Sequence, residues 1–281
     1  GPAVILAGLC QRLAEKGFEV SLITGNCDET EIDHLEVNDL DSRVRVYRIP
    51  TLGRSVSLLS DLKAFFGLRR TLKKIDPEIV HTHTSKAGLL GRLASFSIFR
   101  KQLRVHTFHG HLLYGYFPKL ISTVIITFEK VLSRISHALV SVGESVRKEL
   151  LAQGIGRRVR FEVIRPGIMI PTSIKDESNR YRKGNHAFQI CWVGRLAKIK
   201  RPERVLEIAR LLRNAPGSFN LKIVGGGPYF KVLQDAITRE ALPIELIGWK
   251  PNALREIAES DVVILTSDNE GTPITLIEAQ M

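Results

Sequence analysis

Two carboxylates in the C-terminal segment stand on either side of a predicted helix start. Glu270 precedes Gly271 and Thr272. Thr272 and Pro273 are predicted to open the helix as N-cap and first helical residue, and Glu278 follows inside it. Unpaired amides at a helix start can hold phosphate oxygens, whereas carboxylates accept strong hydrogen bonds from hydroxyls, so we expect a ligand that contains sugar rings. The helix macrodipole alone also favours acidic residues here, and that alternative stays open.

Two cations follow a glycine in a second segment. Gly194 comes directly after a predicted buried strand and allows a tight turn. Arg195 and Lys200 can then both reach the carboxyl end of that strand. A guanidinium and an ammonium together suit a departing diphosphate, although a solvated basic loop is the alternative.

A run of glycines, Gly225, Gly226 and Gly227, follows another predicted strand. Such a run can cradle phosphate or bring backbone close to a ligand, but it can also be only a tight turn. It matches neither the dinucleotide-binding G-x-G-x-x-G pattern nor a Walker A motif.

Five histidines lie at the ends of two further predicted strands, and they are His81, His83, His106, His109 and His111. Open α/β sheets bind ligands at the carboxyl ends of their strands, and His109, followed by Gly110, is the best candidate to face a cleft between domains. A metal site is the alternative. We expect none, because neither loop adds a Cys, Asp or Glu and alternate strand residues point to opposite faces.

The composition is that of a globular protein, with 281 residues, 44% hydrophobic and 25% charged, and a formal net charge of +12. It excludes a disordered chain, a collagen, a coiled coil and a disulfide scaffold. The basic excess is concentrated between Arg54 and Arg134, with 14 basic and four acidic residues, which favours an anionic partner such as nucleic acid, anionic lipid or a phosphorylated ligand. Cys10, Cys27 and Cys191 have no paired spacing, so we expect reduced, buried thiols and a cytoplasmic location.

An apolar run from Leu120 to Leu132 lies inside this basic region, flanked by Lys119, Lys130 and Arg134. Two interpretations remain open: a helix that rests on an anionic membrane surface, and a helix that packs one face on a sheet. No segment predicts a transmembrane helix.

Ten short strands are predicted to alternate with helices, which indicates the α/β class with parallel, doubly wound sheets. The strands are Glu19–Thr24, Val44–Ile49, Ile79–Thr82, Arg104–Phe108, Ala138–Val142, Phe161–Ile164, Phe188–Val193, Asn220–Val224, Ile244–Ile247 and Val262–Leu265. A polar, aperiodic stretch near residue 175 is predicted to be a linker, which gives domains of residues 1–174 and 175–281. We expect a piece of a larger protein, because no strand precedes the first helical pattern and none follows the last helix.

Taken together, these segments resemble glycosyltransferase family 4, which has the GT-B fold of two facing Rossmann-like domains with a cleft between them. The motifs that carry the resemblance are Glu270 with Glu278, Gly194-Arg195 with Lys200, Gly225-Gly226-Gly227-Pro228 and Gly248-Trp249. The segments 81–88 and 107–111 are similar to members that build bacterial surface polysaccharides. The family's first strand with most of its Gly-rich loop, and its last strand and C-terminal helix, have no counterpart in the sequence.

The resemblance implies a retaining, metal-independent transferase without a cofactor. Its donor would be a nucleotide sugar, usually UDP-linked, held by the C-terminal domain, with the N-terminal domain on the acceptor side. The resemblance implies that Arg195 and Lys200 neutralise the diphosphate as it leaves. It implies that Glu270 holds hydroxyls of the transferred sugar and that Glu278 holds the ribose. Gly248 and Trp249 would line the pocket for the base, and His109 would approach the transferred sugar from the N-terminal domain.

We therefore expect transfer of a hexosyl unit to a lipid-linked or polysaccharide acceptor. The expected location is cytoplasmic and peripheral at the inner face of the plasma membrane, with an anionic membrane surface as a further partner and no nucleic acid. One alternative is another GT-B enzyme, such as a nucleotide-sugar epimerase. The other is a non-catalytic protein that binds anions or nucleic acid.

Overall fold

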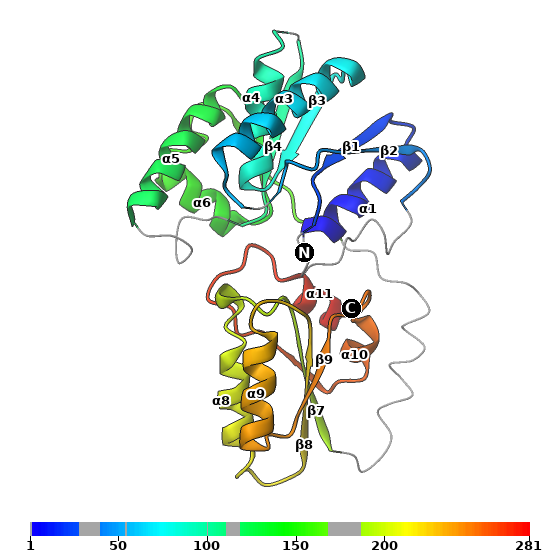
Figure 1. The fold of residues 1–281 in the computed structure, drawn as a ribbon, viewed down its shortest axis with the longest axis vertical. Coiled ribbons are helices and arrows are strands. Elements are labelled where there is room, and N and C mark those ends of the chain that lie inside the picture. The colour runs from blue at the N-terminus through cyan, green and yellow to red at the C-terminus, as the bar shows by residue number, and fades with distance from the viewer. Residues whose placement is uncertain (1, 28–39, 54, 100, 111–118, 168–186) are drawn as a thin grey trace. The chain divides into compact units, whose positions relative to one another are not determined.

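The computed structural model describes residues 2–27, 40–53, 55–99, 101–110, 119–167 and 187–281 (Figure 1). The chain divides into two compact units, Gly1–Gly167 and Ile168–Met281. The predicted domain boundary between residues 174 and 175 lies outside the described residues and stays a prediction.

The N-terminal unit contains two parallel sheets. Its elements are α1 (Pro2–Glu15), β1 (Val20–Thr24), β2 (Val44–Arg48), α3 (Leu58–Ile75), β3 (Ile79–His83), α4 (Ser85–Phe96), β4 (Leu103–Phe108), α5 (Lys119–Arg134), β5 (Ala138–Ser141), α6 (Glu144–Ala152) and β6 (Arg160–Val163). Strands β1 and β2 pair with each other, and the larger sheet has the order β3-β4-β5-β6. Each parallel pairing needs a crossover connection, and helices α4, α5 and α6 supply these crossovers in the larger sheet.

The C-terminal unit contains one parallel sheet of order β10-β7-β8-β9. Its elements are β7 (Phe188–Val193), the 3₁₀ turn η1 (Lys198–Lys200), α8 (Glu203–Leu212), β8 (Phe219–Val224), α9 (Phe230–Glu240), β9 (Ile244–Gly248), α10 (Leu254–Ala258), β10 (Val262–Ile264) and α11 (Ile274–Gln280). Because β7 is covered on both faces, Ile190, Cys191 and Trp192 are all buried, and Trp192 joins Val205 and Leu233 in the core.

All ten predicted strands are present, and every end agrees within one residue. One helix start is corrected: α11 begins at Ile274 with Pro273 as its N-cap, so the prediction of Thr272 as N-cap is wrong. Proline offers no side-chain capping group, and the cap residue has extended backbone angles, φ −77° and ψ 91°. Of the cysteines, Cys10 and Cys191 are buried as expected, whereas Cys27 is exposed.

Candidate functional site

The carboxyl ends of four adjacent strands in the C-terminal unit carry the predicted donor-site residues. Gly194 and Arg195 follow β7, the glycine run follows β8, Trp249 follows β9, and Glu270 lies in the loop after β10. Parallel pairing places these four strand ends at one edge of the sheet, so topology brings together segments that are up to 76 residues apart.

Close backbone contacts explain the glycines at this edge. A Cβ atom on Gly225, whose φ is 150°, would lie 1.8 Å from the carbonyl oxygen of Gly194. The amide of Gly225 donates to the carbonyl oxygen of Gly248 at 2.8 Å, and the amide of Gly194 donates to that of Val224 at 3.0 Å. A Cβ added to Gly226 would lie 3.5 Å from the Cβ atom of Trp249, which is an ordinary van der Waals contact. Gly225 is therefore required for the loops after β7 and β8 to pack, whatever else they bind, whereas position 226 has room for a Cβ atom.

Lys200 and Glu270 form an ion pair across the loops that follow β7 and β10. The ammonium of Lys200 contacts Oε1 of Glu270, and the hydroxyl of Ser267 donates to the same oxygen at 2.6 Å. Their side chains remain 28% and 20% exposed, so the pair is within reach of a ligand. The structure thus brings together one predicted cation and one predicted carboxylate.

A buried hydroxyl fixes the backbone of Lys200. Thr266 Oγ1 accepts a hydrogen bond from Nε1 of Trp192 at 2.9 Å and donates to the carbonyl oxygen of Lys200 at 2.8 Å. Arg204 donates to the carbonyl oxygen of Thr266 at 2.8 Å. Sequence patterns did not identify these supporting residues, and the hydroxyl of Thr266, directly after the apolar run 262–265, was the one signal that could have found them.

A second contact fastens the β10 loop to the η1 turn. The carboxylate of Asp268 pairs with Arg204 at 2.6 Å, and its backbone amide donates to the carbonyl oxygen of Ile199 at 3.0 Å. The loop that carries Glu270 and the turn that carries Lys200 are consequently held as one piece.

The other predicted donor-site residues lie in the loops after the same strands or in α11. Arg195 is exposed and begins the turn that Lys200 ends, with the Ala197 amide donating to its carbonyl oxygen at 2.8 Å. Trp249 is 39% exposed. Glu278 is half-buried in α11, and this burial raises the pKa of its carboxyl group. Gly271 is also half-buried, between the ion pair and α11.

The histidines of the N-terminal unit divide between the two faces of its sheet. His81 contacts β4 and His83 contacts the residue that follows that strand: Nε2 of His81 lies 2.7 Å from Oγ1 of Thr107, and Nδ1 of His83 lies 2.9 Å from Nε2 of His109. His106 lies on the opposite face, 1% exposed, with its Nδ1 atom 2.9 Å from the hydroxyl of Thr82. His111 lies outside the described residues.

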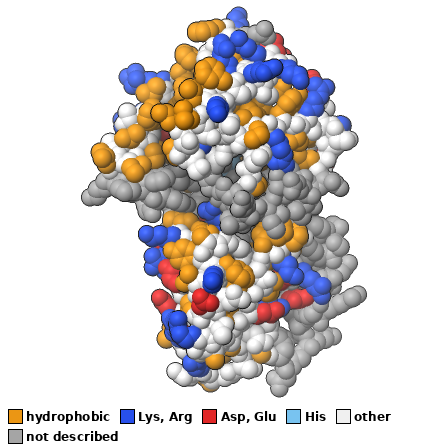
Figure 2. Space-filling model, viewed as in Figure 1, with side chains coloured by type: hydrophobic (Ala, Val, Ile, Leu, Met, Phe, Trp, Pro, Cys, Tyr) orange, Lys and Arg blue, Asp and Glu red, His pale blue; other side chains and the backbone are white. Residues whose placement is uncertain are grey.

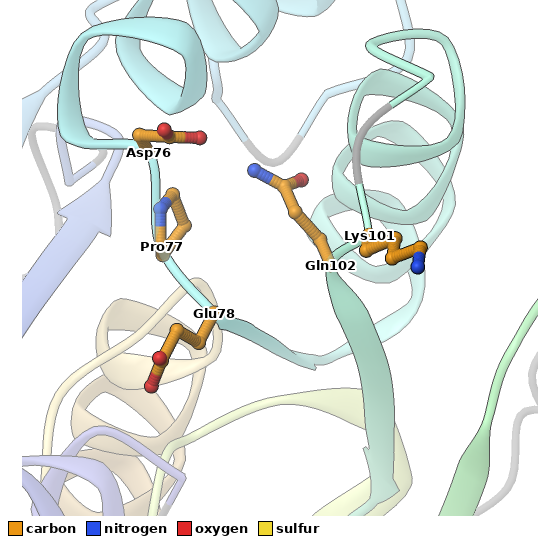
Figure 3. Close-up of a pocket in the computed structure, with 5 residues that line it drawn as sticks. All are labelled: Asp76, Pro77, Glu78, Lys101 and Gln102. Atoms are coloured by element: carbon orange, nitrogen blue, oxygen red, sulfur yellow. The ribbon is translucent and has the colours of Figure 1, made fainter.

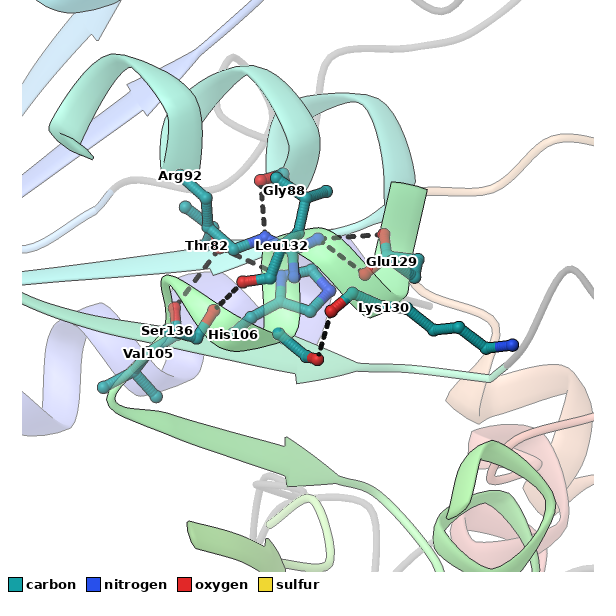
Figure 4. Close-up of polar contacts among 10 residues, drawn as sticks. Thr82, Gly88, Arg92, Val105, His106, Glu129, Lys130, Leu132 and Ser136 are labelled. Carbon is teal, nitrogen blue, oxygen red and sulfur yellow. Dashed lines mark hydrogen bonds and ion pairs between the residues drawn. The ribbon is translucent and has the colours of Figure 1, made fainter. Parts of the chain in front are cut away.

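A buried ion pair lies close to His106 (Figure 4). Arg92, with no exposed surface, donates two hydrogen bonds of 2.8 Å to the carboxylate of Glu129 and one to the carbonyl oxygen of Gly88. Burial lowers the pKa of Arg92 and raises that of Glu129, while the charge of each partner opposes the shift of the other. A Cβ on Gly88 would lie 2.4 Å from the ring of His106, so α4 must carry glycine there.

A pocket at the other end of β3 and β4 contains none of the predicted site residues (Figure 3). Its lining residues are Asp76, Pro77, Glu78, Lys101 and Gln102, which precede the two strands. Because ligands of open α/β sheets bind beyond the carboxyl ends, this pocket lies on the wrong side of the sheet for the predicted site.

Within the described ranges, no three His, Cys, Asp or Glu side chains come close enough to hold a metal ion. Among the helices of the same ranges, none is both long and apolar enough to cross a bilayer.

Two Rossmann-like units with polar loops at the carboxyl ends of their strands define an α/β protein of the GT-B class, as the sequence predicted. Residues 1–170 match the family described as Glycosyltransferase Family 4, and residues 173–281 match the one described as Glycosyl transferases group 1. The chain therefore belongs to glycosyltransferase family 4, and the resemblance to enzymes of bacterial polysaccharide synthesis is confirmed.

Two curated relatives come from bacteria. The chain is 29% identical, over 86% of its length, to the Escherichia coli UDP-Gal:alpha-D-GlcNAc-diphosphoundecaprenol alpha-1,3-galactosyltransferase. It is 23% identical, over 79% of its length, to the capsular polysaccharide biosynthesis glycosyltransferase CapM of Staphylococcus aureus. The chain spans 65% and 57% of the lengths of these two relatives.

Two solved structures share the fold at low identity. Anabaena HepE in complex with UDP and glucose aligns with a TM-score of 0.70 at 19% identity, covering 99% of this chain and 74% of that one. Sucrose-phosphate synthase from Thermosynechococcus elongatus aligns with a TM-score of 0.77 at 17% identity, covering 99% and 73%.

Proposed function

We propose that the chain is part of a retaining glycosyltransferase that moves a hexosyl unit from a UDP-sugar to a lipid-linked or polysaccharide acceptor. The observation that carries the proposal is the contact between Lys200 and Glu270 beside the glycine loops of the C-terminal unit. A cation suited to diphosphate and a carboxylate suited to sugar hydroxyls are thus adjacent. The names of the relatives support a UDP-sugar donor and a lipid-diphosphate or polysaccharide acceptor.

The cations would act on the leaving group. When the bond between the anomeric carbon and the diphosphate oxygen breaks, negative charge develops on the diphosphate. Lys200 has three N–H donors, so it can keep one hydrogen bond to Glu270 while another reaches a phosphate oxygen. Arg195 would supply the second positive charge, and the amides near Gly271 and Thr272 would add dipoles. These groups stabilise the transition state more than the ground state, and their charge allows the reaction to proceed without a metal ion.

The remaining groups would hold the two sugars and the base. Glu270 would accept hydrogen bonds from hydroxyls of the transferred sugar. Glu278 would do the same for the ribose, and Gly248 with Trp249 would line the base pocket. His109, on the N-terminal unit, would meet the transferred sugar from the acceptor side.

The test compares two lysines of one turn in the full-length protein. Lys200→Met removes the paired ammonium, whereas Lys198→Met removes an exposed lysine two residues earlier and is the matched control. With a panel of UDP-sugars and chelator present, we expect Lys200→Met and Glu270→Gln to lower turnover about a hundredfold. Lys198→Met should stay within about twofold of the wild-type rate. Wild-type turnover by Lys200→Met would overturn the proposal.

The products separate the remaining alternatives. Retention predicts that the anomeric configuration of the donor appears unchanged in the product, which NMR of the anomeric proton measures. Release of a free epimerised sugar without an acceptor would indicate an epimerase instead. Salt-dependent binding of DNA or RNA without any UDP-sugar binding would indicate an anion-binding protein.

We further propose that the protein is cytoplasmic and peripheral at an anionic membrane surface, with α5 as the contact helix. Five apolar side chains of α5 are exposed: Leu120, Ile121, Val124, Phe128 and Val131. At about 100° per residue they fall within a stripe about 100° wide, beside the exposed Lys130 and Arg134. The opposite side of the helix is buried at Ser122, Glu129 and Ser133, so α5 both packs on its unit and presents an apolar stripe.

A further inference from the structure

His83 and His109 contact each other through ring nitrogens at the carboxyl ends of β3 and β4. The two nitrogens are 2.9 Å apart, and the ring centroids are 5.2 Å apart with an angle of 37° between the planes. A hydrogen bond between two imidazoles needs one N–H and one lone pair, so this contact couples the tautomers of both residues.

The burial of His109 distinguishes the two possible arrangements. Its second nitrogen, Nδ1, is buried and has no hydrogen-bond partner among the described residues. If His83 Nδ1 carried the bridging proton, His109 would have to place an N–H on that partnerless nitrogen. If Nε2 of His109 carries the bridging proton, Nδ1 of His109 keeps only a lone pair. A buried acceptor without a partner is better tolerated than a buried N–H without a partner.

Both rings must be neutral for this arrangement. Burial lowers the pKa of His83 to about 3, with smaller contributions from His81 and His109, and burial also lowers the pKa of His109. The ring of His81 lies beside that of His83, with the centroids 4.2 Å apart and the planes tilted by 38°, and its own hydrogen bond goes to Thr107. Nδ1 of His83 has His109 as its hydrogen-bond partner.

The backbone next to His83 is strained. Thr84, a β-branched residue, has φ 62° and ψ 167°, a conformation that such residues rarely adopt. Backbone strain of this kind clusters at functional sites, where the surrounding structure holds it in place. This end of β3 thus shows two independent signs of a positioned group, the strain and the partnerless nitrogen.

We propose that His83 is a positioning residue that keeps His109 in its Nε2–H tautomer, so that the lone pair of His109 Nδ1 accepts a hydrogen bond from a hydroxyl of the bound sugar. This inference rests on the proposed function, which has His109 meeting the transferred sugar. His83 itself touches no substrate. It acts by fixing the tautomer and the ring orientation of its neighbour.

The experiment reads the tautomer of His109 without substrate. The full-length protein is labelled with ¹⁵N-histidine, and the two-bond proton–nitrogen correlations show which ring nitrogen carries the proton. His109→Ala assigns the signals. His83→Leu removes the acceptor, and His83→Asn places a side-chain oxygen at the position of Nδ1. His81→Gln is the matched control, because His81 lies on the same strand and its hydrogen bond goes to Thr107, whereas His109 contacts His83.

We expect the Nε2–H tautomer of His109 in the wild-type protein, His81→Gln and His83→Asn, and a mixture of tautomers in His83→Leu. With UDP-sugar and acceptor, kcat of His83→Leu should fall about tenfold while the donor KM changes by about twofold or less, and His83→Asn should restore most of the loss. An Nδ1–H tautomer in the wild-type protein, or an unchanged tautomer in His83→Leu, would overturn the inference. Failure of the proposed transfer reaction would appear separately, as a wild-type protein without turnover.

Discussion

At the scale of single residues, one hydroxyl links the core of the C-terminal unit to its candidate donor site. Thr266 is 8% exposed and Trp192 has no exposed surface, so the indole N–H that binds Thr266 cannot reach water. The same hydroxyl donates to the backbone of Lys200, whose ammonium is paired with Glu270. This chain of hydrogen bonds therefore ties the backbone of the candidate-site lysine to a fully buried aromatic residue.

Substitution of Thr266 tests this link. Thr266→Val keeps the volume but removes the hydroxyl, which leaves the Trp192 N–H buried without a partner and releases the Lys200 carbonyl. We expect the free energy of unfolding to fall by about 1–3 kcal/mol in denaturant titrations. The turnover of a UDP-sugar should fall about tenfold, because a misplaced group loses its alignment with the leaving diphosphate. Thr266→Ser keeps the hydroxyl and is the control, and equal behaviour of the two variants would contradict this account.

At the scale of elements, helix α4 lies unusually close to the strands beneath it. A Cβ on Gly88 would meet the ring of His106, and a Cβ on Gly91 would lie 2.8 Å from a methyl group of Thr82. The close approach removes Arg92 from water, and Glu129 on α5 becomes its charge partner. The ion pair thereby ties two crossover helices to each other above β3, which ends at His83, and β4, which His109 follows.

A double-mutant cycle measures what this ion pair contributes. Glu129→Leu leaves the buried guanidinium unpaired, so we expect a loss of about 3–5 kcal/mol in the free energy of unfolding. Arg92→Met combined with Glu129→Leu removes both charges and should be more stable than Glu129→Leu alone. Chemical unfolding followed by circular dichroism gives the free energies of unfolding of the wild-type protein, Arg92→Met, Glu129→Leu and the double variant. Additive effects of the two substitutions would show that the pair does not interact energetically.

The sequence predicted the elements better than the contacts between them. Short runs rich in β-branched and other apolar residues identify all ten strands. These runs are nearly continuous where a strand is covered on both faces, as in β7, and contain charged residues in β2 and β6. The pairing of Lys200 with Glu270 follows from parallel topology, since both loops must emerge at one edge. The Arg92–Glu129 pair could not be predicted in this way, because its members are 37 residues apart on two amphipathic helices. Likewise, the alternation of side chains along a strand places His83 on one face of the sheet but does not identify His109 as its hydrogen-bond partner.

At the scale of the whole molecule, apolar and basic side chains are both exposed on the N-terminal unit. Figure 2 shows hydrophobic and Lys or Arg side chains interspersed over that unit, in the upper part of the view. Besides the α5 stripe, helix α3 exposes Leu58, Leu59, Leu62 and Phe66 ahead of its basic C-terminal residues Arg70, Lys73 and Lys74. An apolar stripe with cations beside it suits a surface that offers both acyl chains and negative headgroups.

Vesicle flotation of the full-length protein tests the membrane contact of α5. Each buried apolar side chain and each cation near an anionic surface contributes about 1 kcal/mol or more to binding. We therefore expect Val124→Ser with Phe128→Ser to weaken binding to phosphatidylcholine vesicles that contain phosphatidylglycerol by about tenfold or more. Lys130→Ser with Arg134→Ser should weaken the same binding in proportion to the phosphatidylglycerol content, with no effect on pure phosphatidylcholine. Leu211→Ser, which removes a still more exposed apolar side chain from the C-terminal unit, is the control and should bind as the wild-type protein does. If the α5 variants float as the wild-type protein does, this helix is not the contact surface.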